Sequence, residues 1–367
     1  MLVSVVIPAV SWDELLEHTL GTLSAQVLPR GVELETTVAL AGRPPDVLPP
    51  HTRVVPNPGR SIPLGLNRAI AASRGDVVVR VDARCDLAPD HVARVIDVLA
   101  DETVGAVGSA QLVLDRGIFG SAYAVAFNSP LLGPSTYRYG RRSGLVDSAY
   151  LGAWRRSELD ALGGFDTRLR RNQDNELADR VRGLGLGVWY DASSVVGYRS
   201  TRGLRATMAH HGDFGAWRMV QHGHGQRALT TRHVAALAVV AAGGSLGIAA
   251  VASSRTRSLA LGVGLFTYTA AALGATFSAR RLRRCRPDIP EPALNPLGAA
   301  LAPGIAMAIN GAWVAGMVRG AIRSASNRPT DGQATSLPFV DDVGLRTDSN
   351  TSSQASSTTG HEDASAT

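Results

Sequence analysis

Short runs of β-branched residues alternate with segments of helical length through the first 110 residues, and this alternation limits the fold more than any other feature. Five runs have the length and composition of strands, at residues 3–7, 33–40, 53–55, 77–81 and 104–107. Three segments between them carry apolar residues at helical spacing, at residues 15–23, 63–73 and 89–99. The pattern predicts an α/β fold whose mainly parallel sheet is covered by helices on both faces.

A carboxylate directly follows the run at 77–81. In an open α/β sheet, ligands bind beyond the carboxyl ends of the strands, and Asp82 falls at such an end. A carboxylate there can hold a divalent cation, which can in turn hold a diphosphate. The alternative is a turn aspartate that caps the helix predicted to begin near Pro89.

The last third of the chain contains three runs without a charge. They cover residues 233–252, 258–278 and 296–318, and each is long enough to cross a hydrocarbon core of about 30 Å as a helix. A buried helical hairpin in a soluble protein is the alternative, but arginines flank each run. We therefore predict a first domain at 1–225, a membrane region at 226–323 and a disordered Ser/Thr-rich tail at 324–367. Pro303 and Asn310 leave the third run open to a re-entrant path, so two or three helices span the membrane.

The basic residues favour a membrane over nucleic acid. The chain carries a net charge of +6 and no lysine, so all 37 basic residues are arginines, which excludes P-loop and Schiff-base lysine chemistry. Five arginines at 280–286 lie between two apolar runs and are expected in the cytosol. Aromatic residues make up 5% of the chain, too few for a stacking surface for nucleic acid. The apolar run at 2–7 is too short for a signal peptide. The first domain is therefore expected on the cytosolic side of a multi-pass protein of the cell membrane.

The regular pattern stops between Leu114 and Val146, where Gly, Ser, Tyr and Arg dominate. A long segment without secondary structure inside a compact domain is typical of a lid or a binding loop. Tyr137, Arg138 and the neighbouring arginines suit an anionic or sugar-bearing ligand. A solvated polar loop is the alternative.

Five motifs occur in a fixed order and together resemble one family. They are ValValIlePro at 5–8, AsnProGlyArg at 57–60 with ProLeuGlyLeuAsn at 63–67, ArgGlyAsp and ArgValAspAla within 74–83, GlyGlyPheAsp at 163–166, and ArgAsnGlnAspAsnGlu at 171–176. This set is similar to the family 2 glycosyltransferases with a GT-A fold, and closest to the bacterial exopolysaccharide branch typified by the succinoglycan glucosyltransferases. The resemblance covers about residues 1–225, and the apolar runs that follow also fit that branch.

The resemblance implies an inverting transferase that uses a nucleotide-diphosphate sugar with Mg²⁺ or Mn²⁺. It places Asp82 at the metal position, where the cation neutralises the departing diphosphate. It places Asp174 at the position of the base that accepts the proton of the acceptor hydroxyl. The alternative for Asp174 is a helix N-cap or first-turn residue. Pro8 and Asn67, within two of the motifs, are expected to bind substrate.

Two further positions depend on the resemblance. Trp217 and Arg218 match a segment in which an aromatic–arginine pair approaches the acceptor or the diphosphate, although an amphipathic helix at the lipid interface explains them equally well. The metal motif has Arg84 in place of a second aspartate. Either Asp86 supplies the second metal oxygen, or Arg84 binds phosphate as a fixed cation.

The sequence thus predicts a membrane-anchored glycosyltransferase that moves a sugar from a nucleotide donor to a lipid-linked or polysaccharide acceptor, in contact with membrane lipids and without nucleic acid. Many relatives read the nucleobase through an aspartate after the second strand, where this chain has AlaLeuAlaGly at 39–42. That loss, together with Arg84, supports an alternative: a GT-A domain that no longer catalyses and serves as a scaffold in a polysaccharide-assembly complex.

Overall fold

The computed structural model describes residues 1–132, 137–138, 142–169, 171–200, 203–223, 238, 241–242, 244–245, 254–284 and 295–326. The chain divides into two units, Met1–Asn327 and Arg328–Thr367, and all described residues belong to the first. The predicted span at 233–252 and the predicted tail at 324–367 lie almost entirely outside the described residues.

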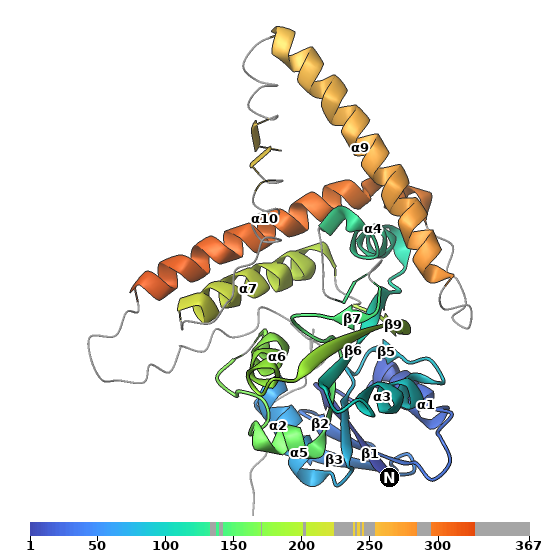
Figure 1. Ribbon diagram of the computed structural model, residues 1–367. Helices are drawn as coiled ribbons and strands as arrows, with labels where there is room; N and C mark the ends of the chain where they lie inside the picture. The colour runs from blue at the N-terminus through green and yellow to red at the C-terminus, as the bar shows by residue number, and fades with distance from the viewer. Residues whose placement is uncertain are drawn as a thin grey trace, which may run out of the picture. The chain divides into compact units, whose positions relative to one another are not determined.

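The centre of the first unit is a sheet in the order β3-β2-β1-β4-β8-β6-β9-β5, with β7 paired to β9 (Figure 1). Its longer strands are β1 (Leu2–Ala9), β2 (Glu33–Leu40), β3 (Thr52–Pro56), β4 (Val77–Arg80), β6 (Val104–Val113) and β9 (Gly187–Tyr198). The pairings β1–β2, β1–β4, β2–β3 and β6–β9 are parallel. The antiparallel pairings all involve a short strand: β5 (Cys85–Asp86), β7 (Gly144–Leu145) or β8 (Ala153–Arg155).

Helices cover both faces of this sheet, as the sequence predicted. On one face α1 (Glu14–Ser24) and α3 (His91–Leu99) pack on β1 residues such as Val5. On the other, α2 (Ile62–Ala72), α5 (Arg156–Ala161) and α6 (Gln173–Gly183) pack on residues that include Val6. Successive strand residues point to opposite faces, so a β-branched run buried on both sides becomes a central strand.

The predicted loop at 114–146 is wrong in its first part. Gly117–Phe127 forms helix α4, and Pro130–Leu132 forms a short 3₁₀ helix, η1. The residues from Gly120 to Phe127 are all buried, because the helix packs on β6 on one side and on two later helices on another. A helix buried all round shows no alternation of apolar and polar residues, so the sequence carried no amphipathic signal.

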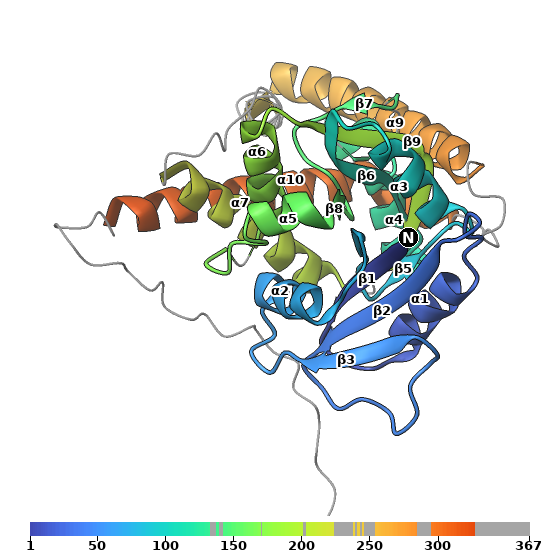
Figure 2. The same cartoon turned by 60° about the horizontal axis from the view of Figure 1, so that its bottom comes forward.

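Three long helices complete the described chain: α7 (Leu204–Gly223), α9 (Ser254–Arg283) and α10 (Pro296–Ser326). Helix α7 packs along the second half of α10, and α4 packs against the first half. Both views show α7 and α10 side by side (Figures 1 and 2). Within the described residues, two segments are long and apolar enough to cross a membrane, Ala260–Arg281 in α9 and Pro296–Ser324 in α10.

Candidate active site

The carboxyl ends of β1 and β4 form the sheet edge at which the sequence predicted a ligand site. The two strands are parallel neighbours, with Val6 paired to Arg80. Pro8 lies two residues beyond Val6, near the end of β1, and Asp82 lies two residues beyond Arg80, so both predicted site residues lie at the same edge of the sheet. The Asp82 side chain is 28% exposed, which keeps it accessible to a ligand.

Helix α6 carries Asp174, the residue predicted to act as the base. The helix begins at Gln173, directly after Asn172, which has a left-handed φ of 61°. Asparagine adopts this conformation more readily than most residues. Asn172 is the N-cap, and Asp174 lies in the first turn, where the positive end of the helix dipole stabilises a carboxylate.

Arg80 joins the two carboxylates. Its Nη1 pairs with Oδ1 of Asp174, and its Nη2 and Nε lie 3.0 and 3.3 Å from Oδ1 of Asp82. The side chain of Arg80 is only 6% exposed. Burial disfavours its charge, but the two carboxylates outweigh burial and raise its pKa. The two acids that the sequence assigned to metal and base therefore flank one buried guanidinium.

Burial and the charges of Arg80 and Asp82 shift the pKa of Asp174 in different directions. Its pKa lies above the ordinary value of an aspartate, chiefly because burial disfavours the charged form; the charge of Asp82 adds to this rise and Arg80 opposes it. A carboxylate with a raised pKa is a stronger base than an ordinary one. The Asp174 side chain remains 30% exposed, so an acceptor hydroxyl can reach it.

Sequence reasoning missed the role of Arg80, which it treated only as an interruption of the strand. All four residues of β4 are buried. A charged residue inside a fully buried β-branched run needs a partner of opposite charge, and that rule is the signal that could have identified it.

Asp86, the second predicted metal ligand, faces the side chains of a histidine and an arginine. Its Oδ2 lies 2.8 Å from Nε2 of His18 and 3.9 Å from Nη2 of Arg199. No group of three or more His, Cys, Asp or Glu residues that could hold a metal occurs in the described ranges. Magnesium bound to nucleotides often takes only one or two carboxylates, with phosphate oxygens completing its shell. Asp82 fits such a shared site, and the role of Asp86 stays a prediction.

Arg84, two residues after Asp82, is held by hydrogen bonds to Arg199 and Ser200. Its Nη1 donates to the carbonyl of Ser200 at 3.0 Å, and its own carbonyl accepts from the amide of Arg199 at 3.1 Å. Ser200 is in turn fixed by the buried Asp115, whose Oδ1 accepts the Ser200 amide at 2.7 Å. The backbone of Arg84 is thus well ordered, and its contact with phosphate stays a prediction.

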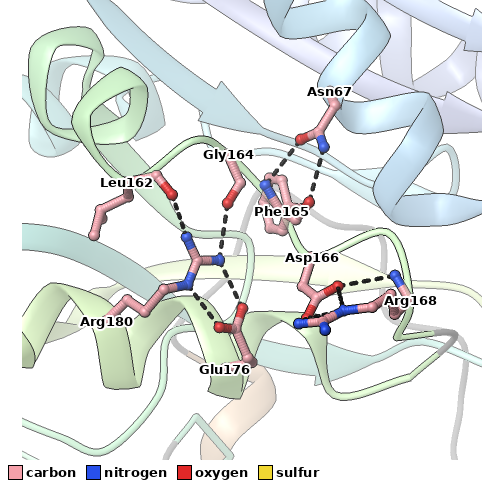
Figure 3. Close-up of polar contacts among 8 residues, drawn as sticks. All are labelled: Asn67, Leu162, Gly164, Phe165, Asp166, Arg168, Glu176 and Arg180. Carbon is pink, nitrogen blue, oxygen red and sulfur yellow. Dashed lines mark hydrogen bonds and ion pairs between the residues drawn. The ribbon is translucent and has the colours of Figure 1, made fainter. Parts of the chain in front are cut away.

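The GlyGlyPheAsp turn at 163–166 is tied to helix α2 by Asn67 (Figure 3). The side-chain Oδ1 accepts the amide of Phe165 and the Nδ2 donates to the carbonyl of Phe165, both at 2.8 Å. Both polar atoms of Asn67 are thereby engaged with the backbone, so its visible role is to position the turn. Its predicted contact with substrate stays a prediction.

Arg180 holds the same turn from helix α6 (Figure 3). It donates to the carbonyls of Leu162 and Gly164 at 2.5 and 2.8 Å, and its Nε and Nη2 pair with Glu176 at 2.6 Å. The pairing with Glu176 agrees with the helical i, i+4 spacing of the two residues. The turn and the helix that carries Asp174 therefore form one connected element.

Trp217 and Arg218 lie on α7, beside the elements that carry Asp174. Burial raises the pKa of Asp179 on α6, and the charges of Arg182 and Arg218 oppose that rise, which places Arg218 near α6. The guanidinium of Arg171, in the loop before α6, stacks 5.5 Å from the ring centre of Phe214 on α7. The position suits the predicted approach to the acceptor, and the contact itself stays a prediction.

A partly buried tyrosine lies beside Cys85, three residues after Asp82. Tyr150 has its hydroxyl 3.9 Å from Sγ of Cys85 and stacks on Tyr137 with ring centres 5.5 Å apart. Its pKa is raised well above the ordinary value, mainly by desolvation. Tyr137 thus contacts Tyr150 from the segment in which sequence analysis expected a binding loop, while residues 139–141 of that segment lie outside the described chain.

The pair of carboxylates at one sheet edge agrees with the glycosyltransferase predicted from the sequence, and the class itself is shown by the family comparison. Residues 64–319 match the family model described as Glycosyl transferase family 21, and the chain belongs to that family.

Other comparisons found proteins to which this chain is similar. The succinoglycan biosynthesis protein ExoA of Rhizobium meliloti (strain 1021) is 28% identical over 153 residues, which are 41% of this chain and 46% of that protein. The chain thus spans about half the length of this curated relative. Among solved structures, the mannosyltransferase PcManGT from Pyrobaculum calidifontis in complex with GDP-Man and Mn²⁺ is 19% identical, with a TM-score of 0.44 over 89% of this chain and 88% of that one. TarS 1–349 of S. aureus in complex with UDP-GlcNAc is 14% identical, with a TM-score of 0.42 over 60% of this chain and 65% of that one.

The predicted glycosyltransferase is confirmed by the family match, although the family model is numbered 21 rather than 2. The resemblance to the succinoglycan branch agrees with the similarity to ExoA. The predicted α/β fold with a mostly parallel sheet is confirmed by the topology.

Proposed function

We propose that this glycosyltransferase is an inverting enzyme that transfers a sugar from a nucleotide-diphosphate donor to a lipid-linked or polysaccharide acceptor at a membrane surface. The observation that carries the proposal is the arrangement around Arg80, which holds Asp82 and Asp174 at one sheet edge. One carboxylate faces the diphosphate side and the other is left to act on the acceptor.

On the donor side, Asp82 would hold Mg²⁺ or Mn²⁺ together with the diphosphate. The metal supplies positive charge that stabilises the departing nucleoside diphosphate. Arg80 keeps one oxygen of Asp82 occupied, and the second oxygen accepts no hydrogen bond from the described residues, which leaves it for the cation. Asp86 or Arg84 completes the site in this proposal.

On the acceptor side, Asp174 would accept the hydroxyl proton as the oxygen attacks the anomeric carbon from the face opposite the diphosphate. Attack from that face inverts the anomeric configuration. The raised pKa of Asp174 supports its role as base. Trp217 and Arg218 would line the acceptor path, because the charge of Arg218 on α7 acts on Asp179 of α6 and Phe214 of α7 contacts Arg171 just before α6.

The candidate membrane helices and the similarity to ExoA support a lipid-linked or polymeric acceptor. Helices α9 and α10 carry candidate spans, and the relative ExoA is named for succinoglycan biosynthesis. A cytosolic catalytic domain, anchored by more than one pass through the cell membrane, would meet a soluble nucleotide sugar and a lipid-linked acceptor at the same surface. The five arginines at 280–286 support the cytosolic side.

The test is a panel of UDP- and GDP-sugars incubated with the full chain in detergent and an extract of membrane lipids. Release of nucleoside diphosphate is measured with Mn²⁺, with Mg²⁺ and with EDTA. We expect turnover with one donor class, stimulation by the cation, and loss of that stimulation in Asp82→Asn. Donor binding without turnover under every condition would favour the non-catalytic scaffold, and no binding of any nucleotide sugar would refute the proposal.

A further inference from the structure

Helix α10 has two opposite faces of different character. One face carries small or buried side chains at helical spacing: Gly298, Ala302, Ala306, Ile309, Gly316 and Gly320. The opposite face is exposed and apolar from residue 297 to 318: Leu297, Leu301, Met307, Ala315 and Val318, with Ile322 exposed one turn further on. No charged residue interrupts the segment from 296 to 318.

The small-residue face packs on α4 at its first half. The carboxamide Oδ1 of Asn295 accepts the amide of Gly298 at 3.1 Å and so starts the helix against α4. A Cβ on Gly298 would lie 2.7 Å from the carbonyl of Ile118 and from Cβ of Ser121. The two helices therefore touch backbone to backbone.

The same face packs on α7 at its second half. A Cβ on Gly316 would overlap the backbone of Gly212, and one on Gly320 would overlap the backbone of Ala216. Contact this close leaves α10 no freedom to separate from α7 without exposing both backbones.

Both partners of α10 are fixed to the catalytic domain. Asn128, at the end of α4, exchanges two hydrogen bonds with the backbone of Val113 on β6, at 2.9 and 2.8 Å. On α7, Phe214 lies under Arg171 and Arg218 lies near Asp179 of α6. Each half of α10 is thus held, through another helix, against the domain that carries the active site.

This packing conflicts with a path of α10 across the bilayer. A crossing α10 would carry one of its halves, with α4 or α7, into the hydrocarbon core of about 30 Å. On the α7 side, that would immerse the charged contacts of Arg171, Asp179 and Arg218, which is costly for each charge.

We propose that α10 does not cross the membrane but lies in the plane of its interface, with its outward apolar face against lipid. An exposed apolar face this long marks a partner, and a lipid surface suits it because the exposed face carries no hydrogen-bonding side chain from residue 297 to 318. Arg323 follows the uncharged segment and is exposed, where it can meet anionic headgroups. Arg319 is turned toward Gly212 of α7.

Helix α9 differs from α10 and serves as an internal comparison. Its later part packs on α4 and on the first half of α10 through Ala275 and Ala279, and Tyr268 of α9 donates to the carbonyl of Ala300 on α10 at 2.9 Å. Leu261, Phe266 and Leu273 are exposed at 60%, 76% and 68%. If α9 crosses the membrane, its arginine-rich end lies on the side of the catalytic domain. If α10 then lies in the plane of the membrane, the residues that follow α10 stay on that side. The three-span path would put them on the opposite side.

Spin-label depth measurements test this inference, which rests on the membrane association proposed above. In a Cys285→Ser background, with Cys85 buried, single cysteines replace Leu301, Ala308, Ala315 and Ile322, which are seven residues apart on the exposed face. The labelled full chain is placed in bilayers of phosphatidylethanolamine and phosphatidylglycerol. Collision rates with oxygen and with a water-soluble nickel complex give the depth of each label.

We expect all four α10 labels at a similar depth, about 5–10 Å below the headgroups. Matched labels at Leu261, Phe266, Leu273 and Phe277 on α9 should instead show a depth that peaks within the series. A peak in the middle of the α10 series would overturn the inference in favour of a span. Low access to both reagents would show that a protein covers the stripe, and α10 labels in water with α9 labels in lipid would also overturn it. Water-exposed labels on both helices would refute membrane association itself.

A second measurement uses the side of the membrane. Reporters are placed in turn in the segment between α9 and α10 and after α10, with green fluorescent protein active in the cytosol and alkaline phosphatase active outside it. We expect both positions on one side of the membrane. Opposite sides would mean that α10 crosses, whatever the enzyme's activity, so this result is independent of the test of glycosyl transfer.

Discussion

Arg80 is the residue on which the geometry of the site depends. It lies in the central strand β4 and contacts Asp82 and Asp174, which come from separate parts of the chain. Its planar fork of donors reaches both carboxylates at once, which a lysine ammonium on a flexible stem does less well. It also offsets the repulsion of two negative charges at one sheet edge.

Removing the guanidinium should destabilise the fold and the site together. Arg80→Met leaves two carboxylates without their shared cation, and loss of one partner of a buried pair costs about 3–5 kcal/mol. Because Asp82 and Asp174 keep partial exposure of 28% and 30%, we expect the lower end of that range. Thermal unfolding in detergent should show a lower Tm for Arg80→Met than for Arg80→Lys. Equal Tm values for wild type and Arg80→Met would contradict this role.

The pKa of Asp174 predicts the acid limb of the pH–rate profile. Asp174 accepts a proton only when charged, and its pKa is raised by burial. Activity should therefore fall as the pH drops through a value above the ordinary aspartate pKa of about 3.9. The measurement is kcat/KM against pH at saturating metal. An acid limb at or below the ordinary value, in enzyme that stays folded, would argue against Asp174 as the base.

Sequence reasoning reached Asp82 from its place at the end of a β-branched strand, and Asp174 from the resemblance of its motif at 171–176 to a known family. It did not reach Arg80, whose function is visible only when a helix residue 94 positions later is brought beside it. Asn67 shows the same limit, because its partner Phe165 is 98 positions away.

At the scale of elements, the GlyGlyPheAsp turn connects α2 and α6 to the site. Both glycines have left-handed backbones, with φ of 71° at Gly163 and 73° at Gly164. They differ in surroundings: a Cβ at Gly163 would meet nothing within 4 Å, whereas one at Gly164 would lie 2.7 Å from Oδ1 of Asn67.

This difference makes a matched pair of variants. Gly163→Ala should cost only the left-handed strain of about 1–2 kcal/mol. Gly164→Ala should cost about 1–3 kcal/mol more, because it also displaces Asn67, and it should reduce turnover by loosening the turn. Thermal unfolding and steady-state rates compare the two. Equal effects of both substitutions would show that the Asn67 contact does not matter.

The elements themselves were largely predictable where one face is buried. The strands and helices of residues 1–107 lie close to their predicted positions, because alternation and helical spacing are local properties. Helix α4 was not predictable, since all its later residues are buried by α10, a partner more than 160 positions away.

At the scale of the whole molecule, the catalytic domain and the long helices are joined by the contact of α7 with α10. Gly316 lies within this contact and Gly311 outside it: a Cβ on Gly316 would overlap Gly212, and one on Gly311 would meet nothing within 4 Å. The two glycines lie on the same helix and so form a second matched pair.

Alanine at position 311 and alanine at position 316 should change the stability of the protein in opposite directions. Gly311→Ala should be neutral or stabilising by up to about 1 kcal/mol, because alanine favours a helix more than glycine does. Gly316→Ala should destabilise by about 1–3 kcal/mol through overpacking and should lower turnover by moving α7. Tm and rate in detergent measure both. A destabilised Gly311→Ala with an unaffected Gly316→Ala would contradict the observed close contact between α7 and α10.

The sequence predicted long apolar helices but not their arrangement. The uncharged run at 296–318 meets the length criterion for a span, and composition does not distinguish the face that packs on protein from the face that meets lipid. The distinction depends on which residues contact α4 and α7, such as Gly298 and Gly316.

The central claim is that Asp174 is the base of a glycosyl transfer whose donor is held at Asp82. The most direct test compares donor binding and nucleoside diphosphate release in wild type, Asp174→Asn and Asp160→Asn, the last an exposed aspartate on α5. We predict that Asp174→Asn binds the donor with unchanged affinity and loses about 10²–10⁴-fold in kcat, while Asp160→Asn matches wild type. Turnover by Asp174→Asn at the wild-type rate would contradict the claim.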